Sequence, residues 1–171
     1  MKREIEQSSP EAQLLSLIDR FDPADQKLIR AIRAALRKRF PTANELAYDY
    51  GASLVVAYSP TDKGIDGIVS FAARATGVDL YFHHGPELPD PKKLLLGSGK
   101  QTRFIHVEAA SRLAHPYVKA LMVAATDCAT VPLPLSAKGS LIMKSSKART
   151  AKKKSSKTKT ARKQSHRTTS T

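Results

Sequence analysis

The sequence contains very little cysteine and no tryptophan, and it lacks the long apolar runs of membrane proteins. Among 171 residues there is one cysteine, Cys128, which excludes an internal disulfide. Cys128 follows an Ala-rich helical pattern without a neighbouring base or positive cluster, so we expect a packed helix end. No apolar run is long enough to cross a bilayer. The first ten residues alternate charges and have no apolar secretory region, so we expect a cytoplasmic protein without a membrane span.

Acidic residues are absent from the C-terminal part of the chain. Residues 138–171 contain twelve Lys or Arg and no Asp or Glu, whereas residues 1–137 contain seventeen basic and fifteen acidic residues. The net charge of +14 therefore divides into +12 for the C-terminal segment and +2 for the rest. Positive charge concentrated in this way indicates a polyanionic partner for one segment, and it carries little information about the fold.

Hydrophobic periodicity predicts two helices, then five strands, then a third helix. Polar residues before Pro10 and Pro23 are helix starts, and apolar residues three and four apart continue the helices to about residues 21 and 40. Pro116 opens the last helix. The β-rich segments are residues 44–51, 53–59, 67–75, 78–84 and 102–108. We therefore predict an α+β two-layer sandwich, in which an antiparallel five-stranded sheet carries the N-terminal helices and the C-terminal helix on one face.

The second predicted helix has a basic side. Lys27, Arg30, Arg33 and Arg37 lie opposite its apolar residues. The preferred interpretation is the solvent-exposed face of an amphipathic helix. The alternative is that these residues add contacts to a polyanion.

Two prolines one residue apart, in the stretch VPLPL, end the predicted domain near residue 131. We assign residues 8–130 to the α+β domain and residues 131–171 to a Pro-containing linker and a basic tail. From Lys144 onward the tail has no aromatic or branched aliphatic residue. It cannot offset the entropy of ordering by burying apolar area, so it is predicted to be disordered.

Motifs for nucleotide hydrolysis, acyl transfer and zinc binding are incomplete. The stretch GSGK has the Gly-Lys of a P-loop, but Leu94 occupies the position of the first glycine and Gln101 that of the hydroxyl. It also leads into a strand, whereas a P-loop leads into a helix. The stretch GASLV lacks the second glycine of a nucleophile elbow, and the chain has no Cys-x-x-Cys or His-Glu-x-x-His. We predict a non-catalytic protein that requires no cofactor.

One small group of potential metal ligands follows the fourth predicted strand. It consists of His83, His84 and Glu87. Adjacent histidines in an extended segment point to opposite faces, so they form a poor bidentate pair unless a turn redirects one of them. The preferred interpretation is an exposed polar loop.

Residues 78–108, VDLYFHHGPELPDPKKLLLGSGKQTRFIHVE, combine several features in a fixed order. A strand ending in aromatics is followed by a Gly-Pro-Glu-Leu-x-Asp-Pro loop, a short Leu-rich helical turn, Gly-x-Gly-Lys, and Arg at the start of the last strand. This combination resembles the YdhG-like family, small bacterial domains of largely unknown function, over about residues 12–127. The earlier AYDYGASLVVAY is similar to a tyrosine-glycine step in that family. The resemblance implies a compact sandwich shaped like frataxin.

The family loop allows two interpretations of Gly97, Gly99, Lys100 and Arg103. In the structural one, the glycines permit positive φ between the turn and the strand, and the two cations are solvated. In the functional one, the cations and exposed backbone amides form an anion site. The structural interpretation is preferred because Gly-rich turns commonly serve geometry alone.

The resemblance also implies an alternative function, because one relative is described as an iron-binding chaperone for iron-sulfur assembly. Frataxin-type iron binding uses a ridge of carboxylates along the first helix and adjoining strand. Here the candidate acidic residues in the N-terminal part of the chain are interleaved with Arg3, Arg20 and Lys27. These acidic residues are Glu4, Glu6, Glu11, Asp19, Asp22 and Asp25. Asp22 is better explained as a helix cap, so iron and an iron-sulfur assembly partner rest on resemblance alone.

The tail is similar in composition to histone-like tails, and we predict that it binds nucleic acid without sequence specificity. Cations that meet phosphates release counterions, which gives salt-sensitive affinity without a fold. The tail has no aromatic residue for base stacking, so no preference for single strands is expected. The alternative is a solvated tail that aids solubility or binds any polyanion, including RNA, anionic lipid or acidic proteins. The candidate contact residues are Lys147, Arg149, Lys152, Lys153, Lys154, Lys157, Lys159, Arg162, Lys163 and Arg167.

Overall fold

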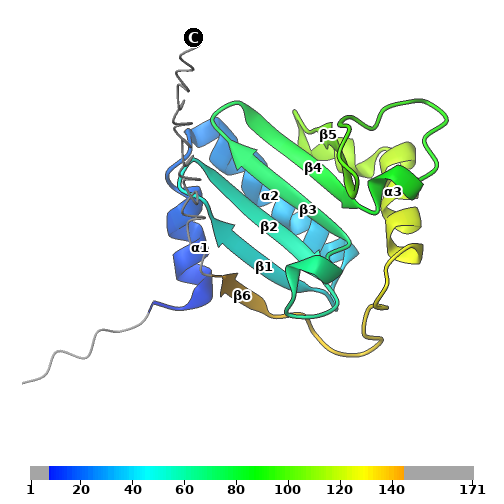
Figure 1. Cartoon of the computed structure of the whole chain (residues 1–171). Helices are drawn as coiled ribbons and strands as arrows, with labels where there is room; N and C mark the ends of the chain where they lie inside the picture. The colour runs from blue at the N-terminus through cyan, green and yellow to red at the C-terminus, as the bar shows by residue number, and fades with distance from the viewer. Residues whose placement is uncertain (1–7, 145–171) are drawn as a thin grey trace, which may run out of the picture.

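The computed structural model describes residues 8–144, which form three α-helices and one sheet (Figure 1). The helices are α1 (Pro10–Ile18), α2 (Pro23–Arg39) and α3 (Pro116–Asp127). The strands are β1 (Asn44–Asp49), β2 (Ser53–Ser59), β3 (Val69–Arg74), β4 (Gly77–His83), β5 (Thr102–His106) and β6 (Leu141–Lys144). Short 3-10 turns occur at η1 (Gly64–Asp66), η2 (Gly85–Glu87) and η3 (Ala110–Ala114). The α+β class predicted from the sequence is therefore confirmed.

Each α-helix begins with a proline in its first turn, as the sequence predicts. The Ser9 hydroxyl accepts a hydrogen bond from the Ala12 amide at 3.2 Å and caps α1. His115 Nδ1 accepts from the Tyr117 amide at 3.3 Å and caps α3. Asp22 occupies the N-cap position of α2, but its side chain makes no capping hydrogen bond. Asp22 therefore occupies the predicted cap position, but its side chain does not cap the helix.

The prediction of five antiparallel strands was wrong, because a sixth strand joins the sheet in parallel. The strand order is β5-β4-β3-β2-β1-β6. Strands β1 to β5 form the predicted antiparallel meander, and β6 pairs with β1 in parallel, with Glu45 opposite Leu141. Strand β6 lies within the 131–171 segment that was predicted to be linker and tail, so the described fold continues past residue 130. Its apolar run, Leu141 to Met143, is too short to be identified as a strand without its distant partner.

The core lies between the helices and one face of the sheet. Side chains alternate between the two faces along a strand. Val56, Phe71, Leu80 and Ile105 are opposite one another on four adjacent strands, so they share a face. They belong to one buried cluster with residues of all three helices, which include Ile18, Ile32 and Leu121. Figure 1 shows α2 crossing behind the sheet, with α1 near β6 and α3 at the opposite end.

The basic side predicted for α2 is only partly exposed. Lys27, Arg30 and Arg37 are exposed, but Arg33 is buried, with 6% of its surface accessible. Arg33 Nε and Nη2 donate to Glu45 at 3.0 and 2.8 Å, and Nη1 and Nη2 donate to Glu11 at 2.5 and 2.8 Å. The assignment of Arg33 to the solvent face was therefore wrong, because Glu45 on β1 supplies a buried carboxylate that helix periodicity cannot reveal.

Tyr58 adds a further hydrogen bond to the buried Arg33–Glu45 pair. The Tyr58 hydroxyl donates to Glu45 Oε1 at 2.9 Å, and burial raises the pKa of Tyr58 well above its usual value. The hydrogen bonds from Arg33 lower the pKa of Glu11, although burial opposes this. A buried charge needs a partner and hydrogen bonds to be tolerated, and both are present here. Arg33 thus joins α2 to α1 through Glu11 and to β1 through Glu45.

One simpler prediction also holds, at the end of α3. Cys128 lies at the C-terminal cap of α3 and is partly buried against the core, as expected of a packed helix end. No helix in this part of the chain is long and apolar enough to span a membrane.

Candidate functional site

The loop that carries the family resemblance connects β4 to β5 and is held by close backbone contacts. His84 adopts a left-handed conformation with φ of 56° and leads into η2. The Gly85 amide donates to the Gln101 carbonyl at 3.1 Å. A Cβ atom on Gly85 would lie 2.3 Å from the Arg103 backbone nitrogen. Only glycine therefore allows the two ends of the loop to approach this closely.

Asp90 organises the middle of this loop. Its two carboxylate oxygens accept from the amides of Leu94 and Leu95 at 2.9 and 2.8 Å, and Oδ1 also accepts from the Tyr117 hydroxyl on α3. Burial acts to raise the pKa of Asp90, but the hydrogen bonds from Tyr117 and the backbone lower it overall. Burial and the neighbouring carboxylate raise the pKa of Tyr117 to about 12. Asp90 thus attaches the loop to α3 as a carboxylate.

Replacing Asp90 with alanine should lower the free energy of unfolding by about 1–2 kcal/mol at pH 7, because three donors lose their acceptor. A group with a lowered folded pKa stabilises above its unfolded pKa of about 3.9 and loses that contribution as pH falls below it. The difference between D90A and the unmodified protein should therefore shrink between pH 5 and pH 3, as measured by urea unfolding. Asp62→Ala removes an exposed carboxylate 3.9 Å from Lys144 and should change stability by less than about 0.5 kcal/mol. Equal effects of both substitutions would contradict this role.

The four candidate residues of the family loop lie in one turn, and their geometry favours the structural interpretation. Leu96 and Phe104 exchange two backbone hydrogen bonds of 2.8 and 3.0 Å, which close the turn. Gly97 has φ of 96°, whereas Gly99 has no positive φ. Arg103 Nη1 donates to the carbonyl of Gly99, and to that of Thr102 at 2.9 Å. Lys100 is exposed. Unlike Arg103, its side chain makes no hydrogen bond to the backbone of the turn among the described residues.

The segment before this turn differs from the prediction. Residues 91–96 form a turn followed by an extended strap, and no helical turn is present there. Leu96 makes its bridge to Phe104 on β5, so the strap covers part of the outer edge of that strand. Pairing with the sheet edge replaces the local helical preference of the leucines, because it satisfies backbone groups that would otherwise be exposed.

The three candidate metal ligands do not converge. His83 packs against the chain at Gly67, where an added Cβ would lie 2.9 Å from the ring, and burial together with His84 lowers the pKa of His83. His84 instead approaches Glu87, with Nδ1 3.4 Å from Oε1. Within residues 8–144, no group of three or more His, Cys, Asp or Glu side chains is arranged to hold a metal ion.

The six carboxylates considered for an iron ridge do not form one cluster. Glu11 pairs with Arg33, and Asp19 lies 2.5 Å from Arg30. Asp22 and Asp25 lie at the start of α2 and form no ion pair with another described residue. Glu4 and Glu6 precede residue 8 and are outside the described residues.

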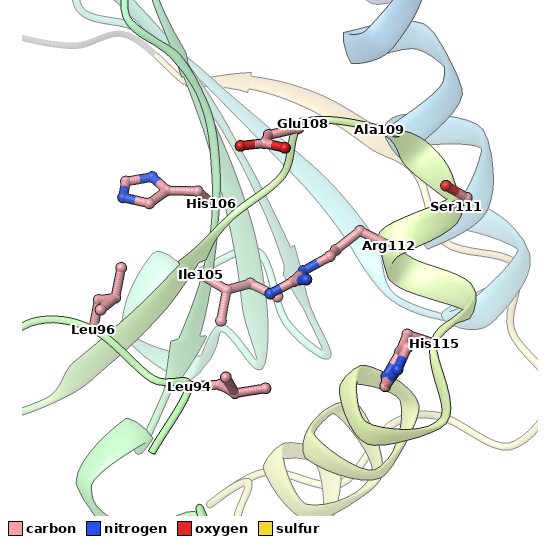
Figure 2. Close-up of a pocket in the computed structure, with 9 residues that line it drawn as sticks. All are labelled: Leu94, Leu96, Ile105, His106, Glu108, Ala109, Ser111, Arg112 and His115. Atoms are coloured by element: carbon pink, nitrogen blue, oxygen red, sulfur yellow. The ribbon is translucent and has the colours of Figure 1, made fainter. Parts of the chain in front are cut away.

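A cavity of about 490 Å³ lies between the strap, β5 and η3 (Figure 2). Figure 2 shows Arg112 reaching into this space from η3, with His115 below it and Leu94 and Ile105 opposite. Arg112 was not predicted from the sequence, because the only signal identified in this segment was the helix start at His115 and Pro116. Arg112 is a cation that can contact an anionic group, but the Glu108 carboxylate also lines the cavity and opposes a negatively charged ligand.

The same cavity does not assemble a nucleophile and a base. His106 and Ser111 line it, but Figure 2 shows His106 projecting from β5 away from η3, which carries Ser111. His106 Nδ1 lies 2.6 Å from Asp79 Oδ1 on β4. Between described residues, no hydrogen bond links a Ser, Thr or Cys side chain to a histidine.

Several exposed cations of the domain lack an acidic partner. Residues 8–144 contain seventeen Lys or Arg and thirteen Asp or Glu. Five carboxylates form ion pairs with arginine, namely Glu11, Asp19, Glu45, Asp49 and Asp79. Within the described residues, Lys38, Arg39, Arg112 and Lys119 form no ion pair. The predicted contact residues of the tail, from Lys147 to Arg167, lie outside the described residues.

Comparison of the chain with protein-family models, with curated proteins and with solved structures finds no match. The resemblance to the YdhG-like family therefore rests on the loop residues quoted above and stays a prediction.

Proposed function

We propose that this protein binds nucleic acid without sequence specificity through its basic C-terminal segment, as a non-catalytic, cytoplasmic protein that needs no cofactor. The observation that supports the proposal most strongly is the charge of residues 138–171, with twelve cations and no anion. Contacts between such a segment and phosphates release condensed counterions, which provides affinity without base recognition. The α+β domain, which resembles the YdhG-like family, acts as the folded support.

The position of β6 gives the basic segment a defined starting point. Lys144 is the last residue of β6 and lies opposite Tyr48 on β1, at the edge of the sheet. The chain from residue 145 onward thus starts from a strand that is hydrogen-bonded to the domain. Because several carboxylates of the domain are paired with arginine, they add little repulsion toward an approaching phosphate chain.

The direct test compares the full chain with residues 1–144, a truncation that keeps β6. With a labelled 25-base-pair duplex at 50 mM salt, the full chain should bind, and the truncated form should bind at least about a hundredfold more weakly. A full-length variant with the ten Lys and Arg after residue 144 replaced by Gln should behave like the truncated form. Equal binding by the full chain and residues 1–144 would overturn the proposal.

Two further probes identify the kind of polyanion. Double-stranded and single-stranded DNA of equal length should bind within about tenfold of each other, because the tail has no aromatic residue to stack on bases. Anionic vesicles that compete better than DNA at equal charge would instead identify lipid as the partner. No arrangement of the described residues favours the iron-chaperone alternative, so the proposal is not extended to it.

A further inference from the structure

A groove lies between the C-terminal end of α2, the 3-10 turn η3 and the first half of α3. We call it the α2/α3 groove, and its volume is about 630 Å³. Its apolar lining includes Leu36, Leu113, Met122 and Val123. Val123 is 44% exposed although it is aliphatic, whereas Leu36, Leu113 and Met122 are buried beneath it. A concave, mostly apolar lining with a few charged groups is typical of a small-molecule site.

The charged residues that line this groove are all positive. Lys38 and Arg39 come from α2 and Lys119 comes from α3, and no acidic residue lines the groove. All three are exposed and form no ion pair with any described residue. The Arg39 guanidinium lies 5.8 Å from the centroid of the Phe40 ring.

Helix electrostatics explains the cations of α2 but not the cation of α3. Lys38 and Arg39 are in the last turn of α2, where positive charge is favourable. Lys119 is in the first turn of α3, where the helix dipole disfavours a cation. Lys119 therefore has no stabilising role visible in the fold, and its position on the groove favours a role toward a negatively charged ligand.

The dimensions of the groove favour a small ligand over a helix of a partner protein. Each helix contributes residues over a single turn, Ala35 to Arg39 and Lys119 to Val123. One turn extends about 6 Å, which is too short for the anchors of an amphipathic helix that recur over two turns or more. The volume lies within the range of small-molecule sites.

We propose that the α2/α3 groove binds an aliphatic chain that ends in a carboxylate or phosphate group. The apolar chain contacts Met122 and Val123, and the anionic oxygens contact Lys119 together with Lys38 or Arg39. Charge-assisted hydrogen bonds from these donors fix the anionic end, and burial of the chain supplies the remaining affinity. This site belongs to the folded domain and does not depend on the proposed binding of nucleic acid by the tail.

The test uses the full chain with NMR detection of the Met122 and Val123 methyl groups. Dodecanoate and dodecyl phosphate, each below its micelle concentration, should shift these signals saturably, and the tighter of the two identifies the head group. Dodecanol has the same chain without the charge and should bind at least about tenfold more weakly. Following methyl signals in the groove separates this binding from any contact of detergent-like anions with the basic tail.

A pair of charge-matched variants controls for net charge. The double variant K38Q/K119Q should weaken dodecanoate binding at least about tenfold. The variant K63Q/K93Q removes two exposed lysines that do not line the groove and should bind as the unmodified protein does. Val123→Asp should abolish the shifts of Met122. No saturable shift with either anion, equal binding of dodecanol, or equal effects of the two double variants would overturn the proposal.

Discussion

Replacing Arg33 with methionine should lower the free energy of unfolding by about 3–5 kcal/mol. The substitution keeps most of the side-chain volume but removes the cation from the buried Glu45 carboxylate, whose side chain is 6% exposed. Among the described residues, Glu45 then keeps the Tyr58 hydroxyl at 2.9 Å and Arg37 at 3.6 Å. An uncompensated buried charge is expensive because water can no longer solvate it. Urea or thermal unfolding measures the loss.

Arg30 provides a matched control on the same helix. Arg30 also pairs with a carboxylate, Asp19, but the two side chains are 41% and 58% exposed. Arg30→Met should therefore cost less than about 1 kcal/mol. The double variant R33M/E45Q should recover part of the stability lost in R33M, because it removes the stranded charge. If R33M and R30M cost the same, the buried pair does not hold the helices to β1 as described.

Gly139→Ala is the second substitution with a large expected effect, because it should detach β6 from the sheet. A Cβ atom at this position would lie 1.7 Å from the Ala43 carbonyl oxygen, which is backbone and cannot move aside as a side chain could. Gly139 also donates to the Pro41 carbonyl at 3.1 Å, and the Glu45 amide donates to the Ser140 carbonyl at 2.9 Å. We expect a loss of at least about 2 kcal/mol and faster hydrogen exchange at the Glu45 amide.

Gly99→Ala is the control for this prediction. Gly99 has no positive φ, and a Cβ atom there would approach other atoms no closer than 3.7 Å. The stability of G99A should stay within about 0.5 kcal/mol of the unmodified protein. Unchanged exchange at Glu45 in G139A would show that β6 is not held by this close approach.

The parts of the fold that follow local rules could be predicted from the sequence. The helix starts at Pro10, Pro23 and Pro116 and the five strands of the meander all appear near their predicted positions. These elements depend on periodicity, capping and turn residues, which act over a few positions. Strand β6 could not be predicted, because its pairing with β1 depends on residues about a hundred positions away in the chain.

The candidate sites were harder to predict because they depend on tertiary neighbours. Arg33 was placed on the solvent side of its helix, since nothing near it in the sequence shows that Glu45 lies against it. Likewise, the sequence does not show that Lys119 on α3 lies beside Lys38 on α2 and the apolar residues of the α2/α3 groove. The resemblance of the β4–β5 loop to the YdhG-like family stays a prediction, whereas the structure gives Gly85 and Gly97 geometric roles. The charge of the tail is a property of sequence alone, so it was visible from the start.

The salt dependence of duplex binding tests the central claim most directly. If about six to ten tail cations meet phosphates, a plot of log affinity against log salt concentration should have a slope of about −5 to −9 for the full chain. Affinity should then fall by about 10³ to 10⁵ between 50 and 200 mM salt. Residues 1–144 should show a much smaller slope under the same conditions. A slope near zero for the full chain, or the same slope for both forms, would contradict the account.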